Sequence, residues 1–168
     1  MINLLFNPQG RIEKGPFWTG FVVLLVVGVA VGWAQAYAAP QRMTPLFTAI
    51  SLTLIYPSVC VYGKRFHDAG KTAWFFGAVV VAQIIGNAVA ALVIAGPHFA
   101  ALQDIEPGTD AFRAAQREIT QTIFLPVQLA ATTVAFVVAF VVSMLPSDPD
   151  TNRFGPPPGG PAQADEFA

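Results

Sequence analysis

The sequence has little charge and almost no cysteine. Only 11% of its 168 residues are Asp, Glu, Lys or Arg, whereas soluble domains carry about 25%. Cys60 is the single cysteine, which excludes an internal disulfide and any zinc site built from several cysteines. The formal net charge is -1 and the basic residues are scattered between apolar segments, so we expect no nucleic-acid partner.

Recognisable catalytic and metal-binding patterns are also absent from the sequence. His67 and His98 are predicted to lie at opposite ends of a membrane span, so they cannot share a metal ion. There is no HExxH or CxxC motif, no glycine-rich phosphate loop and no nucleophile elbow. We therefore expect no metal or other cofactor, and no enzymatic activity based on a known catalytic arrangement.

Hydrophobic residues are what the sequence has in abundance, at 54% of the chain. Four stretches free of Asp, Glu, Lys and Arg each exceed the roughly 20 residues that cross a bilayer as a helix. Buried helices of a soluble protein would need charged faces to cover them, which these stretches lack. The sequence therefore predicts an all-α membrane protein, with a transmembrane domain at 1–146 and four spans at about 17–38, 46–62, 73–94 and 123–145.

The first span also resembles a secretory signal, because basic residues precede it and Ala36-Tyr37-Ala38 follows it. We interpret it as a retained helix, since its apolar segment is longer than the roughly 7–15 residues of a signal sequence.

Basic residues predict the orientation of the chain. Six of the nine lie on one side of the predicted spans: Arg11, Lys14, Lys64, Arg65, Lys71 and Arg153. The other three lie opposite, among several acidic residues: Arg42, Arg113 and Arg117. Because Lys and Arg favour cytoplasmic loops, both termini and the segment around His67 should face the cytoplasm.

Two segments outside the spans have their own patterns. After Pro107-Gly108, apolar residues recur at helical spacing, with Thr109 or Asp110 as a candidate helix cap. This segment is predicted to lie on the outer interface or to extend the fourth span.

Beyond Leu145 the chain is rich in Pro and Gly, so residues 147–168 are predicted to form a disordered cytoplasmic tail.

Small and polar residues recur four apart inside the spans. The small residues, which permit close helix packing, are Gly28, Gly32, Ala78, Ala82, Gly86 and Ala90. Packing within one chain and association with other subunits both explain them. The polar residues are Gln83, Asn87, Gln128 and Thr132. Such side chains usually hydrogen-bond to neighbouring helices, and lining a solute path is the alternative.

One segment, YGKRFHDAGKTAW at 62–74, concentrates charge within this apolar chain. We predict a cytoplasmic loop in which Ala69-Gly70 turns the chain and Thr72 caps the next helix. Asp68 should accept a hydrogen bond from Arg65 or the backbone, and should favour protonated His67.

Two interpretations of this segment remain open. It is a topology signal with a capping Asp, or it belongs to a cytoplasmic-face site that binds anionic headgroups or an acidic partner segment. The residues of that candidate site are Arg11, Lys64, Arg65, His67, Asp68, Lys71 and Arg153.

The same segment carries a family resemblance. GKRFHDAGKTAW resembles the Arg-x-His-Asp-x-Gly-Lys/Arg-Ser/Thr-x-Trp signature of the bacterial inner-membrane family called domain of unknown function 805. The opening GRIEKGPFW is similar to that family's Gly-Arg-Ile and Phe-Trp, and NRFGPPP is similar to its Asn-Arg-Phe/Tyr-Gly-Pro end. The resemblance implies a small multi-pass protein of the bacterial inner membrane, with no known reaction or substrate.

These features predict an accessory or scaffolding subunit of a membrane assembly, with other membrane subunits or itself as partner. Its basic cytoplasmic face is expected to bind anionic lipids. The alternative is a small-solute carrier or channel lined by the four polar residues of the spans.

Overall fold

A computed structural model describes residues 1–38, 41–100, 102 and 104–159 of the chain. In these ranges, the regular elements are all helical: α1 (Ile2–Phe6), α2 (Lys14–Trp33), the π-helix η1 (Ala34–Ala38), the 3-10 helix η2 (Gln41–Met43), α3 (Thr44–Thr53), α4 (Ile55–Asp68), the 3-10 helix η3 (Ala73–Phe75), α5 (Phe76–Ala100) and α6 (Asp110–Ser143). An isolated bridge between Asn152 and Gly155 adds one β-type pairing.

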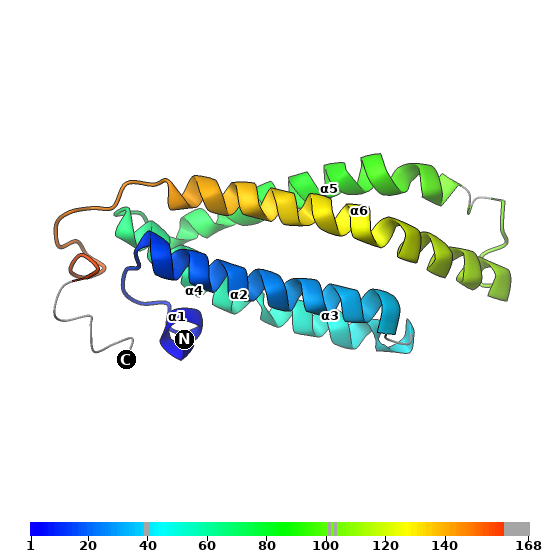
Figure 1. Ribbon diagram of the computed structural model, residues 1–168, viewed down its shortest axis with the longest axis horizontal. Helices are drawn as coiled ribbons and strands as arrows, with labels where there is room; N and C mark the ends of the chain where they lie inside the picture. The colour runs from blue at the N-terminus through cyan, green and yellow to red at the C-terminus, as the bar shows by residue number, and fades with distance from the viewer. Residues whose placement is uncertain (39–40, 101, 103, 160–168) are drawn as a thin grey trace.

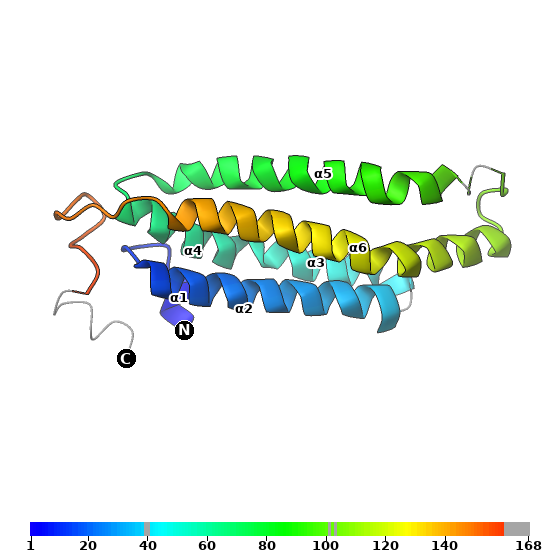
Figure 2. The same cartoon turned by 45° about the horizontal axis from the view of Figure 1, so that its top comes forward.

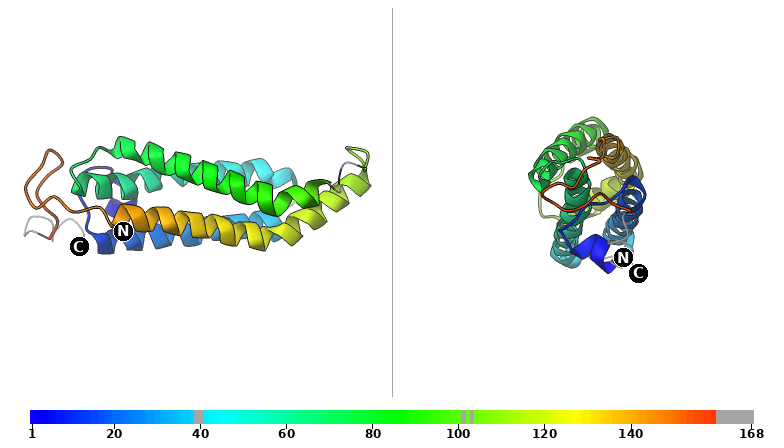
Figure 3. Two further views of the ribbon diagram at one scale, coloured as in Figure 1. Left: turned by 90° about the horizontal axis from the view of Figure 1, so that it is seen from above. Right: turned by 90° about the vertical axis from the view of Figure 1, so that its left-hand side faces the viewer.

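Four helical stretches of the described chain are long and apolar enough to cross a membrane: Lys14–Ala38, Thr44–Asp68, Ala73–His98 and Asp110–Ser143. This confirms the predicted all-helical membrane class. The stretches lie side by side along the long axis of the molecule (Figure 1, Figure 2). We call the end that holds α1 and the segment after α6 the terminal end, and the opposite end the distal end (Figure 3). The side of the membrane that each end faces stays a prediction.

Helix α4 continues further than the sequence predicted. The residues from Tyr62 to Asp68 are helical and buried, so the predicted loop is wrong for this part and the connection to η3 is only 69–72. Gly70, with a φ of +68°, ends the helix as predicted. The Gly70 N–H donates to His67 O at 3.0 Å and the Lys71 N–H donates to Phe66 O at 2.9 Å, which is a Schellman motif.

The second membrane-like stretch is interrupted at Leu54, between α3 and α4. Pro57 has no N–H to donate to the carbonyl of Thr53, so the helical ladder loses a hydrogen bond there. At the same point Leu54 N donates to Ser51 O at 3.2 Å, which is the carbonyl three residues back rather than four. This interruption was not predicted, although Pro57 signals it.

The fourth stretch begins well before the predicted span, at Asp110. Residues 110–122 therefore extend the fourth helix, which is one of the two predicted arrangements. Thr109 caps this helix, because its Oγ1 accepts a hydrogen bond from Phe112 N at 3.1 Å. Thr72 occupies the N-cap position of η3, but its side chain makes no capping hydrogen bond.

Small residues allow two close helix approaches. A Cβ added at Gly20 of α2 would lie 2.8 Å from Val61 Cγ2 of α4. A Cβ added at Gly86 of α5 would lie 2.6 Å from Val134 Cγ1 of α6. Gly86 therefore serves packing within the chain, whereas Ala78 and Ala82 of the same predicted stripe are exposed.

The remaining small residues of the two predicted stripes lie in looser surroundings. A Cβ at Gly28 would meet no atom within 4 Å. One at Gly32 would lie 3.4 Å from Gln128 Oε1, and Ala90 is half-buried.

The short helix α1 packs at the terminal end. Leu4 is buried there, and Tyr56 Oη donates to Phe6 O at 3.1 Å. Lys64 Nζ donates to Asn3 O, at 2.7 Å. The Lys64 side chain is thus buried and bonded to α1, rather than directed to the membrane surface.

Candidate functional site

Asp68, the last residue of α4, lies between two arginines. Its Oδ1 accepts hydrogen bonds from Arg11 Nε at 3.2 Å and from Arg11 Nη2 at 3.1 Å. Its Oδ2 accepts from Arg65 Nη1, one turn earlier on α4. The side chains of all three residues are fully buried. We call Arg11, Arg65 and Asp68 the arginine–aspartate cluster.

One carboxylate cannot satisfy two guanidinium groups, and backbone carbonyls accept most of the other donors. Arg11 donates from Nη1 to Asp150 O at 2.8 Å and to Gly155 O at 3.3 Å, and from Nη2 to Asp148 O. Arg65 donates from Nη2 to the carbonyls of Ser143, at 3.0 Å, and of Leu145. In the described chain, Arg65 Nε is a buried donor without a partner. The cluster thereby fastens residues 143–155 to the terminal end.

The segment 147–159 thus follows a defined path, which corrects the predicted disorder for these residues. Asp148 N donates to Asp68 O at 2.7 Å, and Asn152 and Gly155 bridge each other. A segment rich in Pro and Gly has little apolar surface to bury, but its carbonyls can still accept from buried arginines. The rest of the predicted tail, 160–168, lies outside the described residues.

His67 faces the same segment through its ring and its backbone. Its Nδ1 lies 3.1 Å from Gly10 O, and since a carbonyl only accepts, Nδ1 carries a proton. The ring stacks on Phe154, with centroids 3.8 Å apart and planes 7° apart. Asp68 contacts the two arginines instead of the imidazole, so this geometry does not support its predicted effect on His67 protonation.

Asn152 and Asp148 complete the attachment of this segment, and no role was predicted for Asp148. Asn152 Nδ2 donates to His67 O and to Asp148 Oδ2, both at 3.1 Å. The hydrogen bond from Asn152 is the main cause that lowers the pKa of Asp148, followed by the one from the backbone of Asp150 and the charge of Arg11. The Asp148 carboxylate is therefore a stable acceptor at neutral pH.

The predicted cytoplasmic-face residues thus fall into two groups. The buried group holds Arg11, Lys64, Arg65, His67 and Asp68. The exposed group holds Lys71 and Arg153. Lys71 Nζ lies 5.2 Å from the centroid of the Phe75 ring, and the Arg153 guanidinium lies 4.6 Å from the centroid of the Phe154 ring. In this set, Lys71 and Arg153 are the residues that expose a positive charge.

The structure separates the four polar residues of the spans into two pairs. Gln128 Nε2 of α6 donates to Thr132 Oγ1, at 3.4 Å. Gln83 and Asn87 of α5 instead line a cleft of about 350 Å³, whose other walls come from α2, α3, α4 and α6. Neither carboxamide has a hydrogen-bond partner among the described residues.

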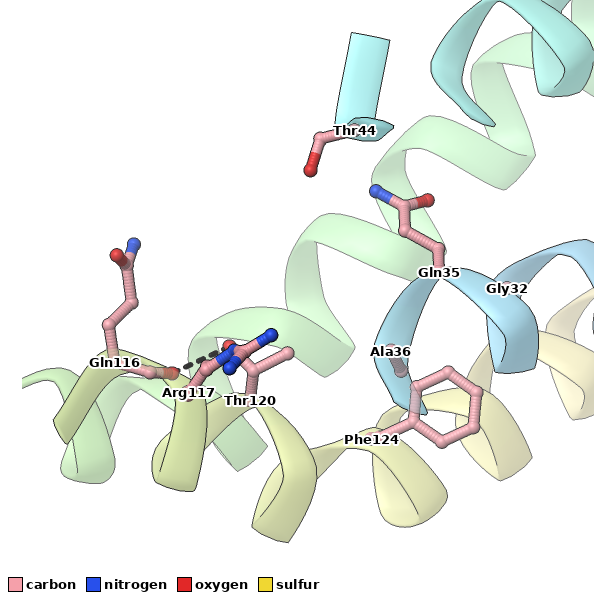
Figure 4. Close-up of a pocket in the computed structure, with 8 residues that line it drawn as sticks. All are labelled: Gly32, Gln35, Ala36, Thr44, Gln116, Arg117, Thr120 and Phe124. Carbon is pink, nitrogen blue, oxygen red and sulfur yellow. Dashed lines mark hydrogen bonds between the residues drawn. The ribbon is translucent and has the colours of Figure 1, made fainter. Parts of the chain in front are cut away.

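A second hollow, of about 510 Å³, lies at the distal end between η1, the start of α3 and α6 (Figure 4). Arg117, Gln35 and Thr44 contribute polar groups to it. In the described ranges, no group of three or more His, Cys, Asp or Glu residues is placed to hold a metal ion.

Comparison with known proteins gives one match. The family model described as "Protein of unknown function (DUF805)" matches residues 5–156. No curated protein and no solved structure matches the chain. The matched range includes the four membrane-like stretches and the whole arginine–aspartate cluster, together with the carbonyls that it binds.

Proposed function

Because the chain belongs to the DUF805 family of proteins of unknown function and has four helices able to cross a membrane, we propose that it is an accessory subunit of a membrane protein assembly. It binds a transmembrane helix of its partner in the cleft beside Gln83 and Asn87. The bacterial inner membrane and a cytoplasmic terminal end are part of this proposal.

The observation that carries the proposal is the pair of carboxamides at membrane depth. Gln83 and Asn87 are one turn apart on α5 and have no hydrogen-bond partner among the described residues. Water is scarce in the hydrocarbon core, so an amide gains by bonding to a polar group on another helix, by about 0.6–2 kcal/mol. The other side chains along the cleft are mostly apolar, which suits a membrane helix with one or two polar residues.

The terminal end supports this role by fixing the helices around the cleft. The arginine–aspartate cluster joins the segment before α2, the end of α4 and the chain from the end of α6 onward. Its charged groups bind one another and the backbone, which fits a structural part better than a substrate site. The exposed bases Lys71 and Arg153 add attraction to anionic headgroups, about 1 kcal/mol each, and Trp74 is 90% exposed, as an interfacial anchor would be.

We favour association over solute transport because of how the polar residues are distributed. A carrier using all four would need them along one path, whereas Gln128 and Thr132 bond to each other and do not line the cleft of Gln83 and Asn87. Among the residues that the structure describes, no Asp, Glu, Lys, Arg or His lines this cleft either.

Site-specific photo-crosslinking in native membranes tests the proposal. A photoreactive residue at Ile84, which lines the cleft, should give one discrete protein adduct, and the same residue at the outward-facing Leu129 of α6 should not. Asn87→Leu should abolish the adduct at Ile84. Gln128→Leu is the matched control, because its amide is paired within α6. Equal adducts at both positions, adducts with lipid alone, or an adduct unaffected by Asn87→Leu would refute this binding mode.

A further inference from the structure

The hollow at the distal end has a polar mouth and an apolar floor. Arg117 and Gln35 project into it from opposite walls, and Thr44 lies at its edge (Figure 4). Gly32, Ala36 and Phe124 form the part nearer the middle of the bundle. A ligand that fits this gradient has a polar head and an apolar portion.

Arg117 is the charge available in this hollow. It makes no ion pair or hydrogen bond among the described residues, whereas Arg113 on the same helix is held by Asp110 at 2.7 Å. The lining residues include no carboxylate in the described part of the chain. The hollow therefore favours an anion over a cation, and the carboxamide of Gln35 and the hydroxyl of Thr44 are further donors for its oxygens.

The wall that carries Gln35 is a π-helix, η1, at the end of the first membrane-like stretch. Tyr37 holds this wall against α6: its Oη donates to Gln121 O at 3.2 Å, and its ring meets that of Phe124 edge-on at 5.2 Å. Turns of π-helix are rare and occur frequently at functional sites. Here the wide turn presents Gln35 and Ala36 to the hollow while Tyr37 packs on α6.

We propose that the distal hollow binds a phosphate-bearing molecule. The phosphate accepts from the Arg117 guanidinium, the Gln35 amide and the Thr44 hydroxyl, and the adjoining apolar part packs on Ala36 and Phe124. A phospholipid headgroup and a soluble phosphate ester share this chemistry. The site is independent of the cleft at Gln83 and Asn87.

The test uses the full chain in two settings. In lipid nanodiscs of phosphatidylcholine with and without phosphatidylglycerol, native mass spectrometry counts the phosphatidylglycerol that stays bound. In detergent, calorimetry measures binding of glycerol phosphate. Arg117→Gln should lower the affinity for whichever probe binds by about tenfold, the loss expected when a charged hydrogen bond is removed. Arg113→Gln, one turn away and outside the hollow, should leave the affinity unchanged.

A second pair of variants separates the hollow from general surface charge. Ala36→Leu fills the hollow without changing charge and should abolish binding, while Ala30→Leu, on the exposed face of α2, should not. Circular dichroism and gel filtration confirm that each variant is folded. Retention of phosphatidylglycerol alone identifies a lipid site, and binding of glycerol phosphate identifies a soluble ligand. Binding of neither probe, equal loss with both Arg variants, or full binding by Ala36→Leu would overturn the proposal.

Discussion

The two ends of the molecule use the same pair of residue types in opposite surroundings. At the terminal end, Arg65 and Asp68 lie three residues apart on α4, with both side chains fully buried. At the distal end, Asp110 and Arg113 lie three residues apart on α6, with side chains 98% and 59% exposed. Spacing and chemistry match, and the environment does not.

This difference shows that burial, more than pairing itself, decides how much the loss of one partner of an ion pair affects stability. An exposed pair is screened by water and salt and contributes little to stability. Removing one partner of a buried pair strongly destabilises the protein, because the remaining charge is buried without water to solvate it. At the terminal end, Asp68 pairs with two arginines, and most of their other donors bind backbone carbonyls.

The largest effect should follow Asp68→Asn, which removes the countercharge of both buried arginines. We expect the free energy of unfolding to fall by about 3–5 kcal/mol, as when one partner of a buried pair is lost. Denaturant titration of the protein in mixed micelles measures it. Asp110→Asn at the distal end is the matched control. If both variants are destabilised equally, burial does not distinguish the two ends.

The next effect concerns the attachment of the C-terminal segment. Arg11→Lys keeps the positive charge but replaces a forked group of five donors with a compact ammonium group, which cannot reach the carbonyls of Asp148, Asp150 and Gly155 together. Deuterium exchange of the amides in 148–155 should quicken by about tenfold. Arg42→Lys, at an exposed site of the distal end, should leave this exchange as it is. Unaltered protection in the Arg11 variant would mean that charge alone holds the segment.

A smaller, pH-dependent effect is expected at Asp148. Its pKa lies below the ordinary value of 3.8, chiefly because Asn152 donates to the carboxylate. At a pH above 3.8 the carboxylate is therefore ionised and stabilises the attached state of segment 148–155. This contribution to stability is lost as the pH falls through the lowered pKa. At neutral pH, Asp148→Asn should exchange deuterium in 148–155 somewhat faster than the wild type. Below the lowered pKa the two should converge, and a difference that persists there would exclude this carboxylate as the cause.

The smallest effect should come from Arg113→Gln. The pair that it breaks is exposed at the distal end, so the unfolding midpoint should not change measurably, in low or in high salt. A midpoint that drops in low salt and recovers in high salt would show that this surface pair contributes more than its exposure suggests.

The spans and the meeting of three distant motifs were predictable from the sequence. Absence of charge over more than 20 residues is sufficient to recognise a membrane helix, and the four stretches agree with that expectation. An even number of spans returns the chain to its starting side, so GRI, the His-Asp segment and NRFG were expected at one face. The structure places Arg11, His67 and Asn152 together there.

The burial of these charges was not predictable in the same way. A run such as KRFHD reads as a solvated loop, because charged residues are rarely buried unless they are paired. Most of the hydrogen bonds from the two arginines go to backbone carbonyls of residues such as Leu145 and Asp150, and every residue has a carbonyl. The sequence therefore does not indicate which carbonyls will accept hydrogen bonds from the arginines. The π-helix at Gln35 was likewise not predicted, whereas the break before Pro57 was visible in the sequence.

The attachment of residues 143–155 also affects the order in which this end of the protein forms during synthesis. Arg11 and Asp148 lie 137 residues apart in the chain, and Arg65 and Leu145 lie 80 apart. While the ribosome is still making the last helix, Arg11, Arg65 and Asp68 already exist, but the carbonyls that complete their bonding do not. A nascent chain, or one truncated before residue 143, therefore carries two arginines with unsatisfied donors at the membrane surface. Their final partners are made only after α6, so the bonding of the two arginines is completed late in synthesis.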